Sequence, residues 1–154
     1  MKNYLKVTVV LIAVIVSACN KTKSTSNKLI KAGEWQVTEL SVDGVNEAEL
    51  PTWEIEDCSI YEESCFAEWK NEEGGHAEFV WQFREKANIF EISHQAEEGH
   101  DHEEDHAAEE AAEQAYNFSG EYEVVEKSKK VMEFTSSNTA GYVGAVVKIV
   151  IEKL

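Results

Sequence analysis

Strict alternation of apolar and polar residues between positions 65 and 95 constrains this chain more than any other feature. In the middle of the stretch, Ala77, Phe79, Trp81 and Phe83 alternate with the residues between them, and the same period of two continues at 65–70 and at 89–94. This period is typical of strands that bury one face. A polar turn with two glycines at 71–75 and a second polar turn at 84–88 separate the three segments. The stretch therefore predicts an antiparallel meander whose aromatic face must be covered.

Further short strands are predicted on both sides of this meander. They lie at 35–42 and 52–56 before it, and at 116–119, 121–126, 131–135 and 142–153 after it. In the first of them, Trp35 and Val37 share one face whereas Leu40 and Val42 share the other, so we expect a bulge or a bend near Glu39. Roughly eight short strands with little helix form a barrel or a sandwich, because both remove exposed sheet edges.

Residues 1–18 have the composition of a signal peptide. Two lysines precede an apolar run at 7–16, which is too short to span a bilayer permanently and ends in Val16-Ser17-Ala18-Cys19. A cysteine after small residues resembles the lipobox of bacterial lipoproteins, which implies cleavage before Cys19 and acylation of that residue. An ordinary secretory signal with an incidental cysteine is the alternative interpretation. The polar segment 19–27 is then a flexible tether, and Asn20 in place of aspartate favours the outer membrane, facing the periplasm.

The net charge excludes some classes of partner, and the two remaining cysteines predict a covalent cross-link. The formal net charge is −16, and it becomes −18 once residues 1–18 and their two lysines are removed. Such a charge argues against nucleic acid as a partner and against contact of the domain surface with anionic lipid, which leaves the lipid anchor as the membrane contact. In an exported chain the pair Cys58 and Cys65 predicts a disulfide.

Residues 96–115 form an acidic, histidine-rich insertion. It holds nine carboxylates and three histidines, and no lysine or arginine occurs between Lys86 and Lys127. Alanine and glutamate favour helix from about position 103, which would place His102 and His106 on one face at a spacing that two ligands of one metal can use. Further ligands could come from His100, Asp105 or Glu109, a set that suits Zn²⁺, Cu²⁺ or Ni²⁺. The alternative is a solvated loop without a ligand.

Several motifs together are similar to the small lipocalin-like lipoproteins of bacteria. These are the lipobox, Gly33-x-Trp35, Asp43-Gly44, the cysteine pair, Trp69-x-Asn71-x-x-Gly74-Gly75 and Phe79-x-Trp81-Gln82-Phe83. The resemblance covers positions 29–154 apart from the insertion. It implies an all-β, antiparallel, up-and-down barrel of roughly eight strands in a domain spanning 28–154. It also implies that a single helical turn at 29–33 covers one end of the barrel, with Trp35 packed beneath it.

Three functional hypotheses follow, and none is catalytic, because the sequence contains no G-x-S-x-G, H-E-x-x-H or phosphate-binding glycine loop. The first is a lipid-anchored binding module for a small apolar or amphipathic ligand. The second is a periplasmic metal buffer or delivery protein that uses the insertion. The third is a surface module that binds or inhibits another protein. The aromatic face is either core or the lining of a ligand cavity, and comprises Trp69, Phe79, Trp81, Phe83 and Phe90.

Overall fold

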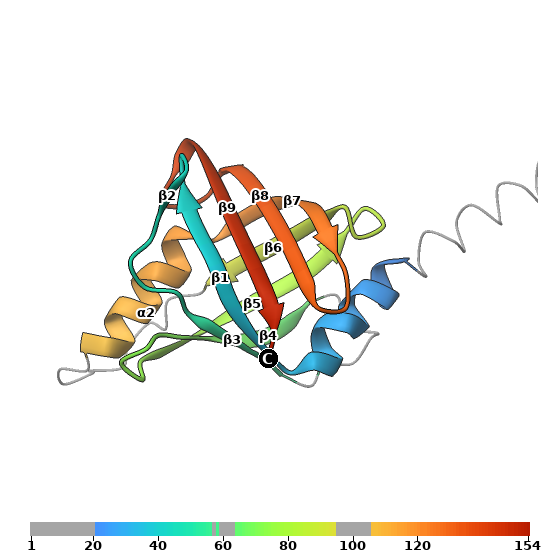
Figure 1. Ribbon diagram of the computed structural model, residues 1–154, viewed down its shortest axis with the longest axis horizontal. Helices are drawn as coiled ribbons and strands as arrows, with labels where there is room; N and C mark the ends of the chain where they lie inside the picture. The colour runs from blue at the N-terminus through green and yellow to red at the C-terminus, as the bar shows by residue number, and fades with distance from the viewer. Residues whose placement is uncertain (1–20, 57, 59–63, 95–105) are drawn as a thin grey trace, which may run out of the picture.

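The computed structural model describes residues 21–56, 58, 64–94 and 106–154. Its centre is one antiparallel sheet that closes on itself as an eight-stranded barrel, because the last strand pairs with the first (Figure 1). The strands follow one another around the barrel in chain order: β1 (Glu34–Val42), β3 (Thr52–Ile55), β4 (Cys65–Lys70), β5 (His76–Arg84), β6 (Ile89–His94), β7 (Gly120–Lys127), β8 (Val131–Asn138) and β9 (Val143–Lys153). The short β2 (Val45–Asn46) forms only a hairpin with β1. The predicted antiparallel up-and-down barrel is confirmed.

The bulge expected in β1 is also present. The register of β1 against β9 shifts between Val37 and Glu39, and both Val37 and Leu40 are buried as a result. The extra residue lets one strand change the parity of its inward positions without leaving the sheet. Cys58 and Cys65 are joined by a disulfide with their Cα atoms 5.6 Å apart, as the sequence predicts.

A helix at 21–32 lies at one end of the barrel, and it is longer than the sequence indicated. The tether expected at 19–27 is wrong from position 21 onward, because Thr25 and Leu29 are both buried against the barrel. These two residues are four apart and so share one helical face. Gly33 ends the helix with a φ of 74°. Trp35 is fully buried beneath it and donates its indole N–H to the Leu29 carbonyl at 3.0 Å.

A second helix, α2 (His106–Asn117), lies in the second half of the insertion and continues past it. The strand predicted at 116–119 is wrong, because Tyr116 and Asn117 end the helix and β7 begins at Gly120. Ala111, Ala115 and Phe118 are buried at a helical spacing of three to four residues. Among the residues whose structure is described, no helix is both long and apolar enough to cross a membrane.

Candidate functional site

The barrel interior is a packed aromatic core. Trp53 of β3 lies at its centre, with ring centroids 5.4 Å from Phe79 of β5 and 6.4 Å from Phe134 of β8. The rings therefore meet across the barrel instead of lining a space. All five aromatic residues named as core or ligand lining are 0–6% exposed: Trp69, Phe79, Trp81, Phe83 and Phe90. They pack as core side chains do.

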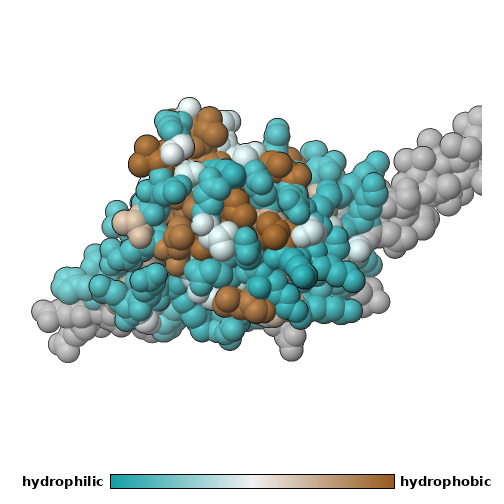
Figure 2. All heavy atoms as spheres, viewed as in Figure 1, coloured by the Kyte–Doolittle hydropathy of each residue, from teal (hydrophilic) through white to brown (hydrophobic). Residues whose placement is uncertain are grey.

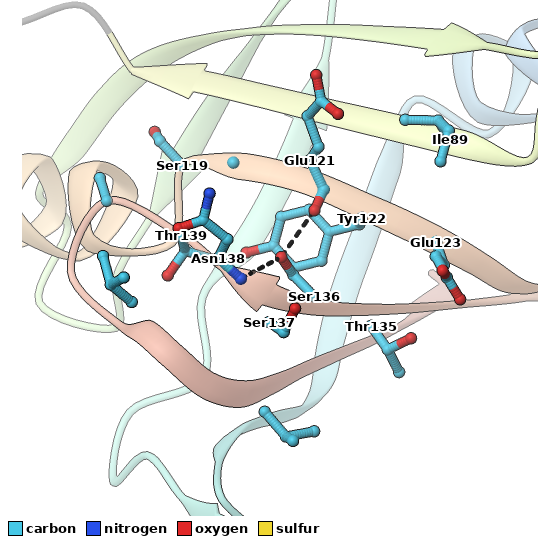
Figure 3. Close-up of a pocket in the computed structure, with 14 residues that line it drawn as sticks. Ile89, Ser119, Glu121, Tyr122, Glu123, Thr135, Ser136, Ser137, Asn138 and Thr139 are labelled. Carbon is cyan, nitrogen blue, oxygen red and sulfur yellow. Dashed lines mark hydrogen bonds between the residues drawn. The ribbon is translucent and has the colours of Figure 1, made fainter.

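A groove of about 850 Å³ lies on the wall of the barrel, where β7 and β8 separate (Figure 3). The two strands pair as far as Glu123 and Thr135, with a register shift between Val124 and Glu126, and they meet again at the bridge between Gly120 and Thr139. Between these points two residues of β7 face three of β8, so a regular ladder cannot form. The separation of the strands creates the floor of the groove.

In this gap, side-chain hydrogen bonds replace the backbone hydrogen bonds of a regular ladder. The Ser136 hydroxyl donates to the Glu121 carbonyl at 2.7 Å and accepts from the Asn138 backbone N–H at 3.1 Å. Figure 3 shows both contacts as dashed lines, and the one between Ser136 and Glu121 joins β8 to β7. Gly120 then allows the strands to approach again, because a Cβ at that position would lie 2.8 Å from the Asn138 carbonyl oxygen. The gap is thus held open by specific contacts.

The lining of the groove is polar on its floor and aliphatic on its rim. Hydroxyl and amide groups come from Ser119 and from the run Thr135–Thr139. Val143 and Val146 also line the groove and are 79% and 58% exposed. Figure 2 shows apolar residues on the surface at the end of the barrel where β2 lies. Thr139 is 3% exposed, and its hydroxyl has no hydrogen-bond partner within the described residues. A buried hydroxyl without a partner is costly unless a bound molecule or water satisfies it.

Charge in the groove is negative but partly neutralised. Glu121 and Glu123 both line it, and Glu121 forms an ion pair with Arg84 of β5. The Glu121 carboxylate and a second one at Glu91 raise the pKa of the Arg84 guanidinium. The Tyr122 side chain points the other way, into the core, where its hydroxyl donates to the Phe118 carbonyl at 2.5 Å and burial raises its pKa. The groove therefore suits a neutral or cationic polar group better than an anionic one.

A second, smaller hollow of about 250 Å³ lies where α2 meets the loop before β3. Its mouth is acidic, because Glu47 and Glu49 of the loop face Glu110 and Glu113 of α2. The Glu110 carboxylate is the main cause of a raised pKa at Glu49, and burial and two further glutamates add to it. This hollow repels anions and carries no polar group that points to a particular ligand.

The metal-ligand set predicted in the insertion is only partly visible. His100, His102 and Asp105 lie outside the described residues. His106 and Glu109 are on the first turn of α2, with the His106 Nδ1 4.0 Å from a Glu109 carboxylate oxygen, and both side chains are largely exposed. In the part of the chain that is described, no three His, Cys, Asp or Glu side chains gather closely enough to hold a metal ion. The metal site remains a hypothesis.

Sequence reasoning missed the groove entirely. One available signal was the run of hydroxyl and amide residues at 135–139, which breaks the alternation expected of a strand. Alternation alone predicts that the strand ends at 135 and that a loop follows. A second signal was Gly120 within a strand, which indicates a bulge or a close backbone approach.

The chain resembles two solved structures at low sequence identity. One is EF1p2_mFAP2b bound to DFHBI, with 10% identity and a TM-score of 0.47 over 86% of this chain and 99% of that chain. The other is an uncharacterized protein from Bacteroides eggerthii DSM 20697, with 18% identity and a TM-score of 0.42 over 79% of this chain and 98% of that one. No family model and no curated protein matches the sequence. The closed eight-stranded barrel itself fits the lipocalin-like architecture.

Proposed function

We propose that this chain is a non-catalytic binding module of the cell envelope, held at the membrane through Cys19, and that a small amphipathic molecule binds in the groove between β7 and β8. The observation that carries the proposal is the opening of the sheet at this place. Its volume of about 850 Å³ lies within the range of about 300–1,000 Å³ that small-molecule sites occupy. In this gap the Ser136 side chain, in place of a backbone ladder, joins β8 to β7.

The lining supports an amphipathic ligand. The aliphatic rim at Val143 and Val146 offers apolar surface, whereas the floor offers hydroxyl and amide groups that can orient a polar head. The Thr139 hydroxyl gains a hydrogen bond if the ligand, or a water held by it, reaches it. The barrel interior is the weaker candidate, because the rings around Trp53 already occupy it.

Native mass spectrometry of the full chain, extracted from its own membrane in mild detergent, tests this proposal. We expect a bound small molecule in the wild type and its loss in Ser137→Trp, where an indole fills the groove. Thr38→Trp adds the same side chain to an exposed position on β1 and should keep the molecule bound. Retention of the molecule in Ser137→Trp, or absence of any bound molecule, contradicts the groove as the binding site.

The variant Thr139→Val separates binding from stability. It removes the hydroxyl but keeps the shape, so the free energy of unfolding should stay the same or rise, because a buried group without a partner is lost. Retention of the ligand should fall by about tenfold, which corresponds to one hydrogen bond of about 1.4 kcal/mol. Urea unfolding checks the first expectation, and the fraction of ligand-bound ions checks the second.

A further inference from the structure

Lysines gather at one end of this strongly acidic protein. The helix at 21–32 carries four lysines and no carboxylate, and the turn at 127–130 between β7 and β8 carries three lysines and no carboxylate. We call these seven residues the lysine patch: Lys21, Lys23, Lys28, Lys31, Lys127, Lys129 and Lys130. Half of the 14 lysines and arginines of the chain therefore belong to two short segments. This is a strong local departure from a net charge of −16.

The fold brings the two segments side by side. The Lys28 ammonium donates to the Lys127 carbonyl at 2.8 Å, across 99 residues of sequence. The Lys127 ammonium in turn donates to the Ala87 carbonyl at 2.6 Å. Burial lowers the pKa of Lys127, and the positive charges of Lys21 and Lys28 lower it further. In Figure 1 the helix at 21–32 lies beside the turn between β7 and β8.

Several members of the patch remain accessible. Lys21, Lys31, Lys129 and Lys130 are exposed. Lys70, Arg84 and Lys148 form ion pairs on the barrel wall, away from the patch. Lys28 and Lys127 contact backbone carbonyls, which leaves their positive charge uncompensated by those contacts.

The other end of the molecule is acidic. Glu49 is close enough to Glu110, Glu73 and Glu72 for all three to raise its pKa. These residues come from the loop before β3, from α2 and from the turn between β4 and β5, which lie at the opposite end of the barrel from the helix at 21–32 (Figure 1). The lysine patch and this carboxylate cluster therefore lie at opposite ends of the barrel, although Glu34, Glu126 and Glu152 also lie near the patch.

We propose that the lysine patch binds the anionic head groups of the membrane at which the chain is held, so that the barrel stands with the helix at 21–32 toward the lipid and α2 away from it. Lys21, the first described residue of this helix, follows Cys19 by two positions in the sequence, so an anchor at Cys19 would bring the patch to the surface, and the inference rests on that proposed anchoring. The inference is independent of the ligand groove. It revises the expectation that an acidic domain is simply repelled by anionic lipid.

The range of electrostatic forces explains why the patch prevails over the net charge. Salt screens exposed charges beyond about 8–10 Å at physiological ionic strength, so carboxylates at the far end act weakly on the membrane. Each lysine near an anionic surface is attracted to it, so a few well-placed lysines are enough to orient an anchored domain. Raising the salt concentration should weaken this contact.

Amine footprinting of the full chain in vesicles tests the inference. Vesicles of phosphatidylcholine are compared with vesicles that also contain about 30 mol % phosphatidylglycerol, at low salt and again at about 0.5 M salt, where the screening length is only a few ångströms. A membrane-impermeant acylating reagent is applied, and labelling at each lysine is followed by mass spectrometry. Lys21 and Lys153 are the reporters, because both are exposed and the Lys153 backbone N–H donates to the Lys130 carbonyl. Lys148, on the barrel wall, is the internal reference.

In the wild type we expect the two reporters to react about threefold or more slowly in the anionic vesicles than in the neutral ones, and high salt should remove the difference. Equal labelling in both kinds of vesicle at low salt overturns the inference. Slow labelling of the reporters in both kinds of vesicle also overturns the inference, because the reporters would then be shielded by the anchor and not by anionic head groups.

Two variants with the same change in net charge separate the patch from the total charge. The patch variant replaces three exposed lysines: Lys31→Gln, Lys129→Gln and Lys130→Gln. The control variant adds three acids to exposed positions at the other end: Asn46→Glu, Ala48→Glu and Ala140→Glu. The patch variant should lose the slow labelling in anionic vesicles, whereas the control should keep it. An equal effect of the two variants, or no effect of the patch variant, shows that the patch does not bind the membrane.

Discussion

Two tryptophans of the barrel core are equally buried but differ in their hydrogen bonds. Trp53 and Trp69 are both fully buried, and their ring centroids are 5.6 Å apart. The Trp69 indole donates to the Gln114 side chain at 2.8 Å, whereas the Trp53 indole has no partner among the described residues. Removal of water from the Trp53 N–H is therefore an uncompensated cost within the core.

Replacing each tryptophan by phenylalanine should reveal this difference. Both substitutions remove a similar volume, but Trp69→Phe breaks a hydrogen bond and Trp53→Phe removes an unsatisfied donor. We expect Trp69→Phe to lower the free energy of unfolding by about 1–3 kcal/mol more than Trp53→Phe does. Urea unfolding of the two variants measures the difference. Equal losses would show that Trp53 has a partner such as an internal water.

At the scale of single residues, the sequence predicts the face of the strand on which a side chain lies, but not the residue with which that side chain forms a hydrogen bond. The alternation of β4 correctly places Trp69 on the buried face, because the period of two follows from strand geometry. The partner Gln114 lies 45 residues away on α2, and no local pattern can connect the two. The same limit explains why the unpartnered Thr139 was missed.

The elements at the acidic end are held together despite like charges. The turn between β4 and β5 touches the start of α2, where the Asn71 amide donates to the Ala107 carbonyl at 2.8 Å. Gly75 permits this approach, because a Cβ there would lie 1.9 Å from the Ala107 carbonyl oxygen. Around these contacts Glu110 raises the pKa of Glu49. The packing of α2 therefore opposes an electrostatic repulsion that depends on pH.

Glu110→Gln should stabilise the protein at neutral pH. A raised carboxyl pKa means that the folded state retains the Glu49 proton more readily than the unfolded state, so stability falls as pH rises above the ordinary value of 4.5. Removing the Glu110 charge should make this fall smaller. Urea midpoints at pH 5 and pH 7 measure it, with Glu109→Gln on the exposed side of α2 as the matched control. A similar gain in the control would assign the effect to net charge alone.

Helices were the least predictable elements. The alanine and glutamate composition correctly predicted helix in the second half of the insertion, but the burial of Ala111 and Ala115 depends on β4, β5 and β6. The segment 21–27 has the composition of a tether, and its helix is stabilised by the burial of Thr25 and Leu29. Tertiary packing decides such marginal helices, and composition does not contain it.

The sequence predicts the closed barrel better than it predicts the features on the barrel surface. Alternation, turn residues and the bulge near Glu39 led to the closed barrel, because each reflects local backbone geometry. The groove and the lysine patch need segments that are far apart in sequence, such as Gly120 with Thr139 and Lys28 with Lys127. Net charge alone predicts repulsion from anionic lipid, which is the opposite of what we propose for the lysine patch.

The proposed anchoring through Cys19 predicts how the whole protein partitions in cells. Cys19→Ser should leave the protein unprocessed or release it from the membrane fraction after a high-salt wash, which removes contacts made by lysines. The double variant Cys58→Ser, Cys65→Ser, which lacks only the disulfide, should remain with the membrane. Fractionation and intact mass measure both outcomes. Unchanged mass and partition of Cys19→Ser would contradict lipidation at this residue.

Closure of the barrel by β1 and β9 also determines when the protein can fold. The two strands are joined by contacts such as that between Lys148 and Glu39, which are 109 residues apart. Contacts of such long sequence separation form slowly, because the whole intervening chain must first be ordered. Until β9 has been synthesised, β1 and β8 are unpaired edges that can associate with other chains. The risk of aggregation therefore lasts throughout synthesis and ends only with the final strand.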